Sequence, residues 1–385
     1  MAITDKTTGI WGLDQAYNKI NQGSIWEYSS SVNSFFIWGR NQFGELGQNS
    51  PANSNLSSPT QIPGSWSEIT SFSGSYSIGG IKTDRTWWAW GKNQYGQLGQ
   101  NQKDVHYSSP VQIPGTWSEA EIGATNSYGI NTSGELFVMG FDNDGAMGVN
   151  TKSVSYSSPT QIPGSTWKQV GLNYYGMAAT KTDGALWAWG AAGDGQLGQN
   201  SRTYYSSPVQ IPGTTWSIVK GTGSSNFLAI KTDGTLWAWG ANGNGALGLN
   251  QATGFKASSP TQVGSDSDWS DISAGGCVGA IKTDGTLWMW GSGGSGRLGQ
   301  NATQSKSSPV QVPGTTWAQV KCDSDRTYAR KTDGSIWAMG ANEYGTLGQN
   351  SPGPSGVSSP IQIGSDTDWS SVGATQMMGV ALKKL

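Results

Sequence analysis

A Trp-Gly or Met-Gly pair recurs at an almost constant spacing of about fifty residues along the chain. The pairs stand at Trp38-Gly39, Trp90-Gly91, Met139-Gly140, Trp189-Gly190, Trp239-Gly240, Trp290-Gly291 and Met339-Gly340. Such a period is typical of arrays in which each unit buries its apolar face only against its neighbours. We therefore expect one continuous array, although 385 residues would otherwise favour two or three domains.

The repeats are out of phase with the ends of the chain. The last copy stops after Val380-Ala381-Leu382, where every other copy continues through a hairpin into a second strand. The missing strand is found near the other end, in residues 35–39. An open solenoid would need polar capping repeats, whereas pairing the two ends removes both exposed edges. The sequence therefore predicts a closed ring.

Each repeat contains four short β-strands. Residues 227–232 and 235–239 are β-rich and are joined by Asp233-Gly234, a strong hairpin signal. A strand with a proline, Pro260 in this copy, suits a sheet edge because proline has no N–H to donate. The predicted fold is all-β: residues 31–385 form a seven-bladed β-propeller of four-stranded blades, with one blade closed by the N- and C-terminal strands. Residues 1–30 form a separate N-terminal segment.

Tryptophan doublets explain most of the 20 tryptophans as packing residues. Trp237 and Trp239 are two residues apart and therefore project from the same face of a strand. The doublet recurs in three other copies, at Trp88/Trp90, Trp187/Trp189 and Trp288/Trp290. We expect these rings to fill the space between stacked blades.

Composition excludes several classes of partner. Charged residues make up 12% of the chain, and the net charge is −2, so there is no electrostatic footprint for nucleic acid. No apolar stretch is long enough to span a bilayer, and the N-terminus lacks the features of a secretory signal. We therefore expect that the protein is made in a cytoplasm and does not insert into a membrane. Two cysteines rule out a disulfide scaffold, and Cys277 and Cys322 are interpreted as buried free thiols, with a bridge left open.

The repeat motif resembles that of the regulator of chromosome condensation family. The matching pattern is Gly-Ala-Asn-x-x-Gly-x-Leu-Gly, then Ser-Pro-x-Gln-Ile, then Ala-Ile-Lys-Thr-Asp-Gly-Thr-Leu-Trp-Ala-Trp-Gly, and it covers residues 30–385. The resemblance implies a seven-bladed propeller closed by both termini, but it leaves function open because propellers serve many roles. The family's Gly-x-His-Ser segment is absent, and so are its photoreceptor tryptophan motifs. We therefore expect neither nucleotide exchange nor light sensing.

The N-terminal segment is similar to short leaders of bacteriophage structural and appendage proteins. Leu13, Ala16, Tyr17 and Ile20 form an apolar stripe at helical spacing, and Trp11 and Trp26 flank it. A helix this short is not stable alone in water, so it must dock, either on its own propeller or on a partner. The attachment residues proposed from this pattern are Trp11, Leu13, Tyr17, Ile20 and Trp26.

The chain lacks the residues for common catalytic chemistry. Its single histidine, His106, lies in a polar loop, so no nucleophile–base arrangement is expected. No His/Cys cluster has metal spacing, and Asp142-Asn143-Asp144 is interpreted as a turn. The prediction is a non-enzymatic protein with no cofactor and no metal.

Departures between copies carry more functional information than the matches. Residues 321–330 place charges where sister copies carry small or apolar residues, which favours an internal ion-pair network over a ligand site. Arg85 replaces the hairpin glycine, and Gly264-Ser265-Asp266-Ser267-Asp268 and its counterpart in residues 364–368 are interpreted as expanded turns. Seven variable segments should share one side of the ring: 50–56, 102–107, 151–156, 201–205, 251–257, 302–306 and 350–357. Their aromatic residues are the candidate binding residues: Tyr107, Tyr156, Tyr204, Tyr205 and Phe255.

These observations lead to a hypothesis of function. The protein is interpreted as an appendage or decoration protein of a phage virion, attached to other virion proteins by its N-terminal segment. Its loops would meet a host-surface receptor or glycan. The alternative is a cytoplasmic scaffold or regulator that acts by protein–protein interaction.

Overall fold

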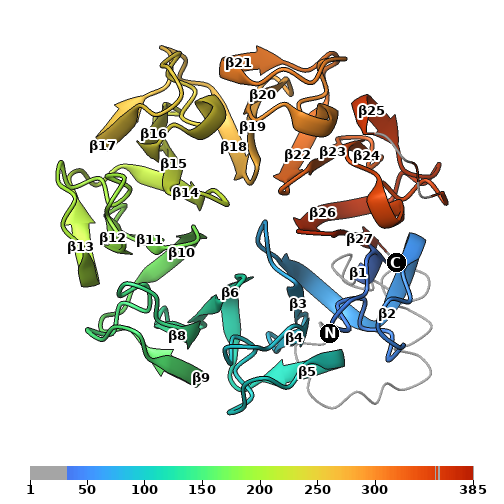
Figure 1. The fold of residues 1–385 in the computed structure, drawn as a ribbon, viewed down its shortest axis with the longest axis horizontal. Helices are drawn as coiled ribbons and strands as arrows, with labels where there is room; N and C mark the ends of the chain where they lie inside the picture. The colour runs from blue at the N-terminus through green and yellow to red at the C-terminus, as the bar shows by residue number, and fades with distance from the viewer. Residues whose placement is uncertain (1–32, 352, 354–355, 385) are drawn as a thin grey trace, which may run out of the picture.

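The computed structural model describes residues 33–384, except residues 352, 354 and 355. Its strands are arranged as blades around a central axis, and the chain runs once around the ring (Figure 1). The predicted all-β, seven-bladed β-propeller is confirmed. The segment 1–30, with Trp11, Leu13, Tyr17, Ile20 and Trp26, lies outside the described residues.

Five blades are formed by four consecutive antiparallel strands each. These strands are Trp117–Ile122 (β6), Asn126–Asn131 (β7), Leu136–Phe141 (β8) and Ser155–Gln161 (β9); Trp167–Leu172 (β10), Gly176–Lys181 (β11), Leu186–Gly190 (β12) and Tyr205–Ile211 (β13); Trp216–Gly221 (β14), Asn226–Lys231 (β15), Leu236–Ala241 (β16) and Lys256–Gln262 (β17); Trp269–Ala274 (β18), Cys277–Lys282 (β19), Leu287–Gly291 (β20) and Lys306–Gln311 (β21); Trp317–Cys322 (β22), Arg326–Lys331 (β23), Ile336–Gly340 (β24) and Val357–Gln362 (β25). Short 3-10 turns follow three of the third strands: Gly243–Gly245 (η1), Gly294–Gly296 (η2) and Glu343–Gly345 (η3).

The other two blades share a seven-stranded sheet of order β26-β27-β1-β2-β3-β4-β5. Its strands are Trp369–Thr375 (β26), Met378–Lys384 (β27), Asn33–Gly39 (β1), Leu56–Thr70 (β2), Ser77–Lys82 (β3), Trp87–Gly91 (β4) and Tyr107–Ile113 (β5). The 15-residue β2 is the outer strand of one blade and the inner strand of the next. Strands β27 and β1 pair from Asn33↔Lys384 to Gly39↔Met378, so the two ends of the chain close one blade, as predicted.

The second tryptophan of each doublet joins neighbouring blades. Trp239 is fully buried, and its indole N–H donates to the Gln196 carbonyl of the preceding blade at 2.8 Å. The same bond is made in four other blades, by Trp38 to Thr346, Trp90 to Glu45, Trp189 to Ala146 and Trp290 to Ala246. The first member differs: Trp237 also packs on Trp216 but remains half-exposed on the outer wall of the ring. The packing prediction therefore holds fully only for the second member.

The hairpin signals also form as expected. Gly234 adopts a φ of 79° in the β15–β16 hairpin, in the left-handed region that glycine tolerates. Arg85 has a φ of 67° at the equivalent position of the β3–β4 hairpin, so the backbone geometry persists without glycine.

Candidate functional site

The order of strands divides the connections between two faces of the ring. In each antiparallel blade, the connections from first to second strand and from third to fourth strand emerge at the same end. We call this end the loop face. The hairpins between second and third strands lie at the opposite end, the hairpin face. All seven variable segments connect third to fourth strands, so they share the loop face, as the sequence predicts.

Exposed large hydrophobic side chains gather on the loop face. Within the described part of the chain, every side chain of this kind lies there: Val105 43%, Val154 42%, Tyr175 44%, Tyr204 42%, Phe255 40% and Tyr344 39% exposed. Four of them, Val105, Val154, Tyr204 and Phe255, lie one or two residues before the outer strand of successive blades. An arc of exposed apolar side chains on a rigid frame is typical of an interaction surface.

The five candidate binding residues divide into two groups. Tyr204 and Phe255 are exposed on the loop face. Tyr107, Tyr156 and Tyr205 are half-buried and pack against the cores between blades. The hydroxyl of Tyr156 lies 3.1 Å from that of Thr151, and that of Tyr107 lies 3.3 Å from the Gln102 amide oxygen.

Sequence reasoning missed four of the six exposed side chains: Val105, Val154, Tyr175 and Tyr344. Val105 and Val154 occupy the same position as Phe255, one residue before the position of Tyr204, so alignment of the copies at the outer strand would have found them. Tyr175 lies in a connection from first to second strand, outside the seven variable segments that the sequence singled out. Tyr344 lies in the glycine-rich turn η3, where Arg40 stacks on its ring at 5.0 Å.

A second aromatic cluster occupies the loop face beside β4. Phe43 contacts Tyr76 and His106 edge to face, with ring centroids at 5.6 and 5.0 Å, and the Lys92 ammonium lies 5.3 Å from its ring. The Asn93 N–H donates to Nδ1 of His106. Burial and the neighbouring Lys92 lower the pKa of His106, so its ring is neutral at physiological pH.

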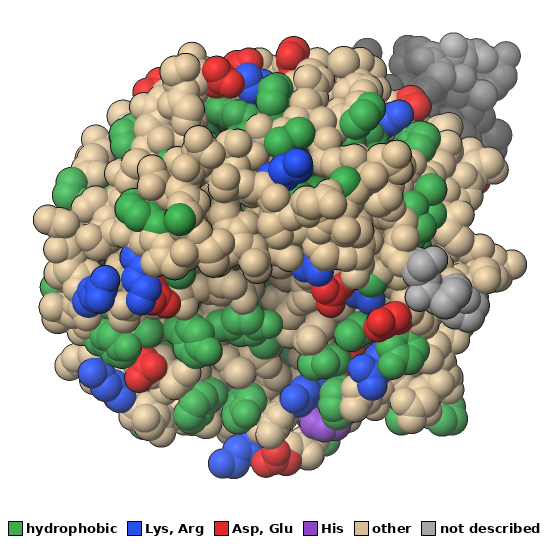
Figure 2. Space-filling model, turned by 45° about the horizontal axis from the view of Figure 1, so that its top comes forward, with side chains coloured by type: hydrophobic (Ala, Val, Ile, Leu, Met, Phe, Trp, Pro, Cys, Tyr) green, Lys and Arg blue, Asp and Glu red, His purple; other side chains and the backbone are tan. Residues whose placement is uncertain are grey.

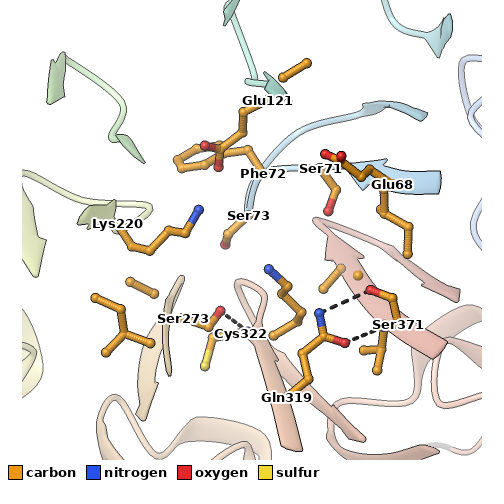
Figure 3. A pocket seen from close by; sticks show the side chains of 18 of the residues that line it. Glu68, Ser71, Phe72, Ser73, Glu121, Lys220, Ser273, Gln319, Cys322 and Ser371 are labelled. Atoms are coloured by element: carbon orange, nitrogen blue, oxygen red, sulfur yellow. Dashed lines mark hydrogen bonds between the residues drawn. The ribbon is translucent and has the colours of Figure 1, made fainter. Parts of the chain in front are cut away.

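A polar cavity of about 210 Å³ lies on the axis between the innermost strands (Figure 3). Lys220, Glu121 and Ser73 point toward it from different blades. Its volume corresponds to about seven water molecules and lies below the ~300–1,000 Å³ of small-molecule sites. The cavity is therefore suited to water and buried charge rather than to a substrate.

Charges in the cavity influence one another without direct contact. The side chains of Glu121, Lys220 and Lys321 make no hydrogen bond or ion pair within the described residues. Burial alone would lower the pKa of Lys220, but the carboxylates of Glu121 and Glu119 raise it. Burial and the ammonium of Lys220 together lower the pKa of Lys321.

Side chains of the inner strands also join neighbouring blades. Glu119 accepts a hydrogen bond from the Val170 N–H of the next blade at 3.2 Å. In the same way, Gln169 accepts from the Val219 N–H at 3.0 Å, and Gln319 accepts from the Val372 N–H at 2.8 Å. Burial raises the pKa of Glu119 to about 7, against the opposing effects of Lys220 and of that N–H. Glutamine serves this position in sister blades, so the role of Glu119 is to hold blades together.

The charged segment predicted at 321–330 forms an internal ion-pair network, as expected. Arg326 and Asp323 are both fully buried, with Nη1 and Oδ2 3.2 Å apart. Arg326 also donates to the carbonyls of Ala341 and Gln376, and the second of these belongs to the closing blade. Arg297 pairs with Asp325 at 2.7 Å. Cys277 and Cys322 are buried and free.

Other kinds of site are not seen among the described residues. Residues 33–384, gaps excepted, contain no cluster of three or more His, Cys, Asp or Glu side chains suited to a metal ion. The same part of the chain has no helix with the length and apolar character needed to cross a bilayer. Charged side chains lie in small separate groups over the face seen in Figure 2. Asp142 caps a turn by accepting the Met147 N–H, as its interpretation as a turn residue requires.

The fold and the loop face define a seven-bladed propeller that presents variable loops on one side. Four segments match the family model described as the regulator of chromosome condensation (RCC1) repeat: residues 87–127, 183–227, 233–277 and 284–329. These four segments of the propeller are thus similar to RCC1 repeats. No curated protein matches it in sequence.

Solved structures show the same fold at low sequence identity. Prp20p of Saccharomyces cerevisiae, in a study of its binding to Gsp1p and histones, superposes with a TM-score of 0.80 at 18% identity over 92% of each chain. Human WBSCR16 superposes with a TM-score of 0.78 at 19% identity, over 92% of this chain and 99% of that one. Yeast RCC1 (Prp20) bound to Kap60 gives 0.80 at 18% identity over 92% of this chain and 89% of the other.

Proposed function

We propose that this protein is a non-enzymatic binding protein that contacts a partner through the loop face. The arc formed by Val105, Val154, Tyr204 and Phe255 carries this proposal, because an exposed apolar side chain precedes the outer strand in four successive blades. Tyrosine and phenylalanine supply large contact areas at low entropic cost, and partly buried aromatic anchors dominate many interfaces. The similar yeast propeller has protein partners, which supports a protein as the partner here.

We further propose that the propeller is an appendage or decoration protein of a phage virion. Asn33 and Lys384 pair at the hairpin face, so the chain enters the ring on the side opposite the loop face. An N-terminal attachment to other virion proteins would therefore leave the loop face pointing outward. The resemblance of residues 1–30 to phage leaders supports this arrangement, with a host-surface receptor or glycan as the distal partner.

A cytoplasmic interaction scaffold is the second candidate. It uses the same loop face and differs in requiring no particle. The partners of the yeast propeller favour it, since that protein binds Gsp1p, histones and Kap60.

Particle incorporation tests the virion proposal. The full chain and a variant lacking residues 1–30 would be produced during infection and followed through particle purification. We expect the full chain in the particle fraction and at least a tenfold loss for the shortened chain. Equal incorporation of both would contradict attachment by this segment, and recovery of both only in soluble complexes would favour the scaffold.

Paired variants test the loop face itself. Proximity labelling with the full chain as bait should lose at least tenfold of its strongest partner signal when Tyr204 and Phe255 are both replaced by Ser. The matched control replaces exposed hairpin-face residues, Thr214→Asp with Ser267→Asp, and should keep the signal. A signal lost equally in both variants, or in neither, would contradict binding through this face.

A further inference from the structure

Four cavities of one design lie on the outer wall of the ring, between the outer strands of neighbouring blades. We call them the wall grooves and name each by its half-exposed tryptophan: Trp88, Trp187, Trp237 and Trp288. Their volumes are about 380, 550, 300 and 390 Å³, within the ~300–1,000 Å³ of ligand sites. They open on the wall, and each is lined in part by a connection from third to fourth strand, such as residues 148–150 in the Trp187 groove. Tyr156, one of the candidate binding residues, also lines the Trp187 groove.

The Trp88, Trp187 and Trp237 grooves are each lined by aromatic rings, a lysine and a proline. The Trp288 groove has the rings and the proline, and its Lys282 lies over both rings without lining the cavity. In the Trp187 groove, the Lys181 ammonium lies 4.7 Å from the centroid of buried Trp167 and 5.1 Å from that of Trp187. Pro208 and Asn150 come from the two flanking blades. The arrangement offers a flat apolar surface beside a positive charge, with amide and hydroxyl groups at the rim.

The lysines of the grooves exist in two different states. Lys82, Lys181 and Lys231 contact only tryptophan rings; within the described residues their ammonium groups have no hydrogen-bond acceptor or carboxylate partner. Lys282, in the Trp288 groove, is instead held by Asp266 at 2.6 Å and Asp268 at 3.2 Å. Those carboxylates come from the expanded turn that distinguishes this copy in the sequence.

The Trp288 groove therefore shows which group satisfies the lysine. Its own Asp266 lines the cavity and places a carboxylate on the ammonium. The other three grooves have the same rings and the same lysine but no carboxylate. An external ligand that fits them carries a carboxylate next to an apolar face.

The Trp187 groove, at about 550 Å³, has the largest volume of the three. Its lysine lies farther from the wall ring than Lys82 and Lys231 do, which are 3.8 and 3.9 Å from theirs. Sister wall tryptophans donate their indole N–H to a threonine or serine two residues earlier, as Trp237 does to Thr235 at 2.8 Å. Ala185 replaces that residue beside Trp187, whose N–H has no partner. The Trp187 ring lacks the bond that holds the others and is freer to adjust to a ligand.

We propose that the wall grooves with an unpaired lysine bind acidic pyranose units of a polysaccharide. The sugar's carboxylate would pair with the ammonium, its C–H face would pack on the half-exposed indole, and its hydroxyls would meet the amide and hydroxyl groups at the rim. Three such grooves on one ring allow multivalent attachment, so weak individual sites give strong binding to a polymer. None of the six exposed side chains of the loop face lines these grooves, so the proposal does not depend on the partner proposed for that face.

Affinity electrophoresis of the full chain in gels containing polygalacturonate tests the proposal. With a net charge of −2, the protein has no general attraction to a polyanion, so retardation reports local sites. We expect retardation by polygalacturonate and none by dextran, a neutral polysaccharide. The triple variant Lys82→Gln, Lys181→Gln, Lys231→Gln should bind at least tenfold more weakly, whereas Lys282→Gln should bind as the natural chain does.

Transplanting the carboxylates gives the sharper comparison. Thr166→Asp places an acid directly before Trp167, where Asp268 precedes Trp269, and should close the Trp187 groove. The reverse change, Asp266→Ser with Asp268→Thr, should open the Trp288 groove and strengthen retardation. Circular dichroism verifies that each variant is folded.

The outcomes separate the alternatives. Absence of retardation, or equal retardation by dextran, would overturn the proposal. Equal retardation by poly-glutamate would show that any carboxylate polymer is sufficient and would overturn the assignment to a saccharide. The loop-face variant Tyr204→Ser with Phe255→Ser should retain retardation; its loss would place binding at the loop face instead of the wall.

Discussion

The closing blade and the β14–β17 blade have the same architecture but different connectivity. Asn226↔Gly240 in the β15–β16 hairpin corresponds to Met378↔Gly39 between β27 and β1. The tryptophan bond to the preceding blade is also present in both, from Trp239 to Gln196 and from Trp38 to Thr346. In one blade the paired strands are joined by a hairpin, and in the other they come from opposite ends of the chain. The register is thus determined by side-chain packing rather than by the turn.

The seam between the ends has additional connections. Continuous β2 joins the closing blade to the blade that follows it. On its other side, Arg326 reaches the Gln376 carbonyl, whereas the equivalent Asn226 bonds only within its own blade, to Ala241. The closing blade lacks the hairpin, but it is connected to the following blade by β2 and to the preceding blade by the Arg326 hydrogen bond.

Removing the last strand should have the largest effect on this comparison. A chain ending at Gln376 lacks Met378, Val380 and Leu382, all fully buried, and leaves β1 and β26 with unpaired edges. Each lost side chain costs roughly 1.5–3 kcal/mol of burial before the lost ladder is counted, so we expect no stable monomer. Size-exclusion chromatography and circular dichroism measure this. A chain ending at Lys384 is the control, and a cooperative, monomeric truncated protein would contradict the importance of closure.

Replacing the buried arginine should have the next largest effect. Arg326→Asn leaves the Asp323 carboxyl unpaired, and we expect a loss of about 3–5 kcal/mol in the free energy of unfolding. Burial already raises the pKa of Asp323 to about 6, so the loss should be smaller below pH 6. Urea denaturation at pH 5 and pH 8 measures both effects.

A double variant separates the charge from the bond across the seam. Asp323→Thr with Arg326→Asn reproduces the hydrogen-bonded Thr222–Asn226 pair of the β14–β17 blade. We expect it to recover most of the lost stability. If the double variant recovers none of the lost free energy of unfolding, the hydrogen bond from Arg326 to Gln376 carries the effect. That bond would then be the difference in stability between the two blades.

The smallest effect is expected at the inner-strand bond. Glu119→Gln introduces the residue that Gln319 provides next to the seam. Because the pKa of Glu119 is raised to about 7 in the folded state, its stabilising protonation is complete below about pH 4 and is lost as the pH rises through 7. Glu119 lines the polar cavity, which is large enough to admit water, and screening there reduces the expected difference to about 1–2 kcal/mol.

The variant should therefore match the natural chain at pH 4 and exceed its stability at pH 8. Urea denaturation across this range measures the difference, and Gln319→Ala, which removes a bond without a titrating group, is the control. A difference between Glu119→Gln and the natural chain that does not change with pH would contradict the shifted pKa.

The architecture was predictable because the repeat pattern is local and redundant. Seven copies of one motif indicate the blades, and the half-hairpins around Phe35 and Leu382 indicate the closure. The buried pair of Arg326 and Asp323 was predictable for a related reason. Sister copies carry small or apolar residues at these positions, so charges there are expected to be buried and to need a partner. Exposure was harder to predict: Tyr204 and Tyr205 are neighbours, yet the first faces solvent and the second packs on the core.

The wall grooves were not predictable from one repeat. Each groove joins residues of two blades, such as Asn150 and Pro208, about sixty residues apart in sequence, which only the curvature of the ring brings together. The expanded turn at 264–268 was visible, but its pairing with Lys282 depends on how the inter-blade link folds over the wall. The attachment residues Trp11, Leu13, Tyr17, Ile20 and Trp26 remain a prediction.

The pairing of Asn33 with Lys384 has a consequence for biosynthesis. The first strand leaves the ribosome early and waits through nearly the whole of translation for the strand that completes its blade. During that time the nascent chain is an open ring, and one edge of β1 exposes unpaired backbone N–H and C=O groups that can pair with any other extended peptide nearby. The order of synthesis therefore makes the emergence of β27 from the ribosome the step at which the ring can close. Crowded polysomes carry the greatest risk that two growing open rings exchange strands and close as a pair.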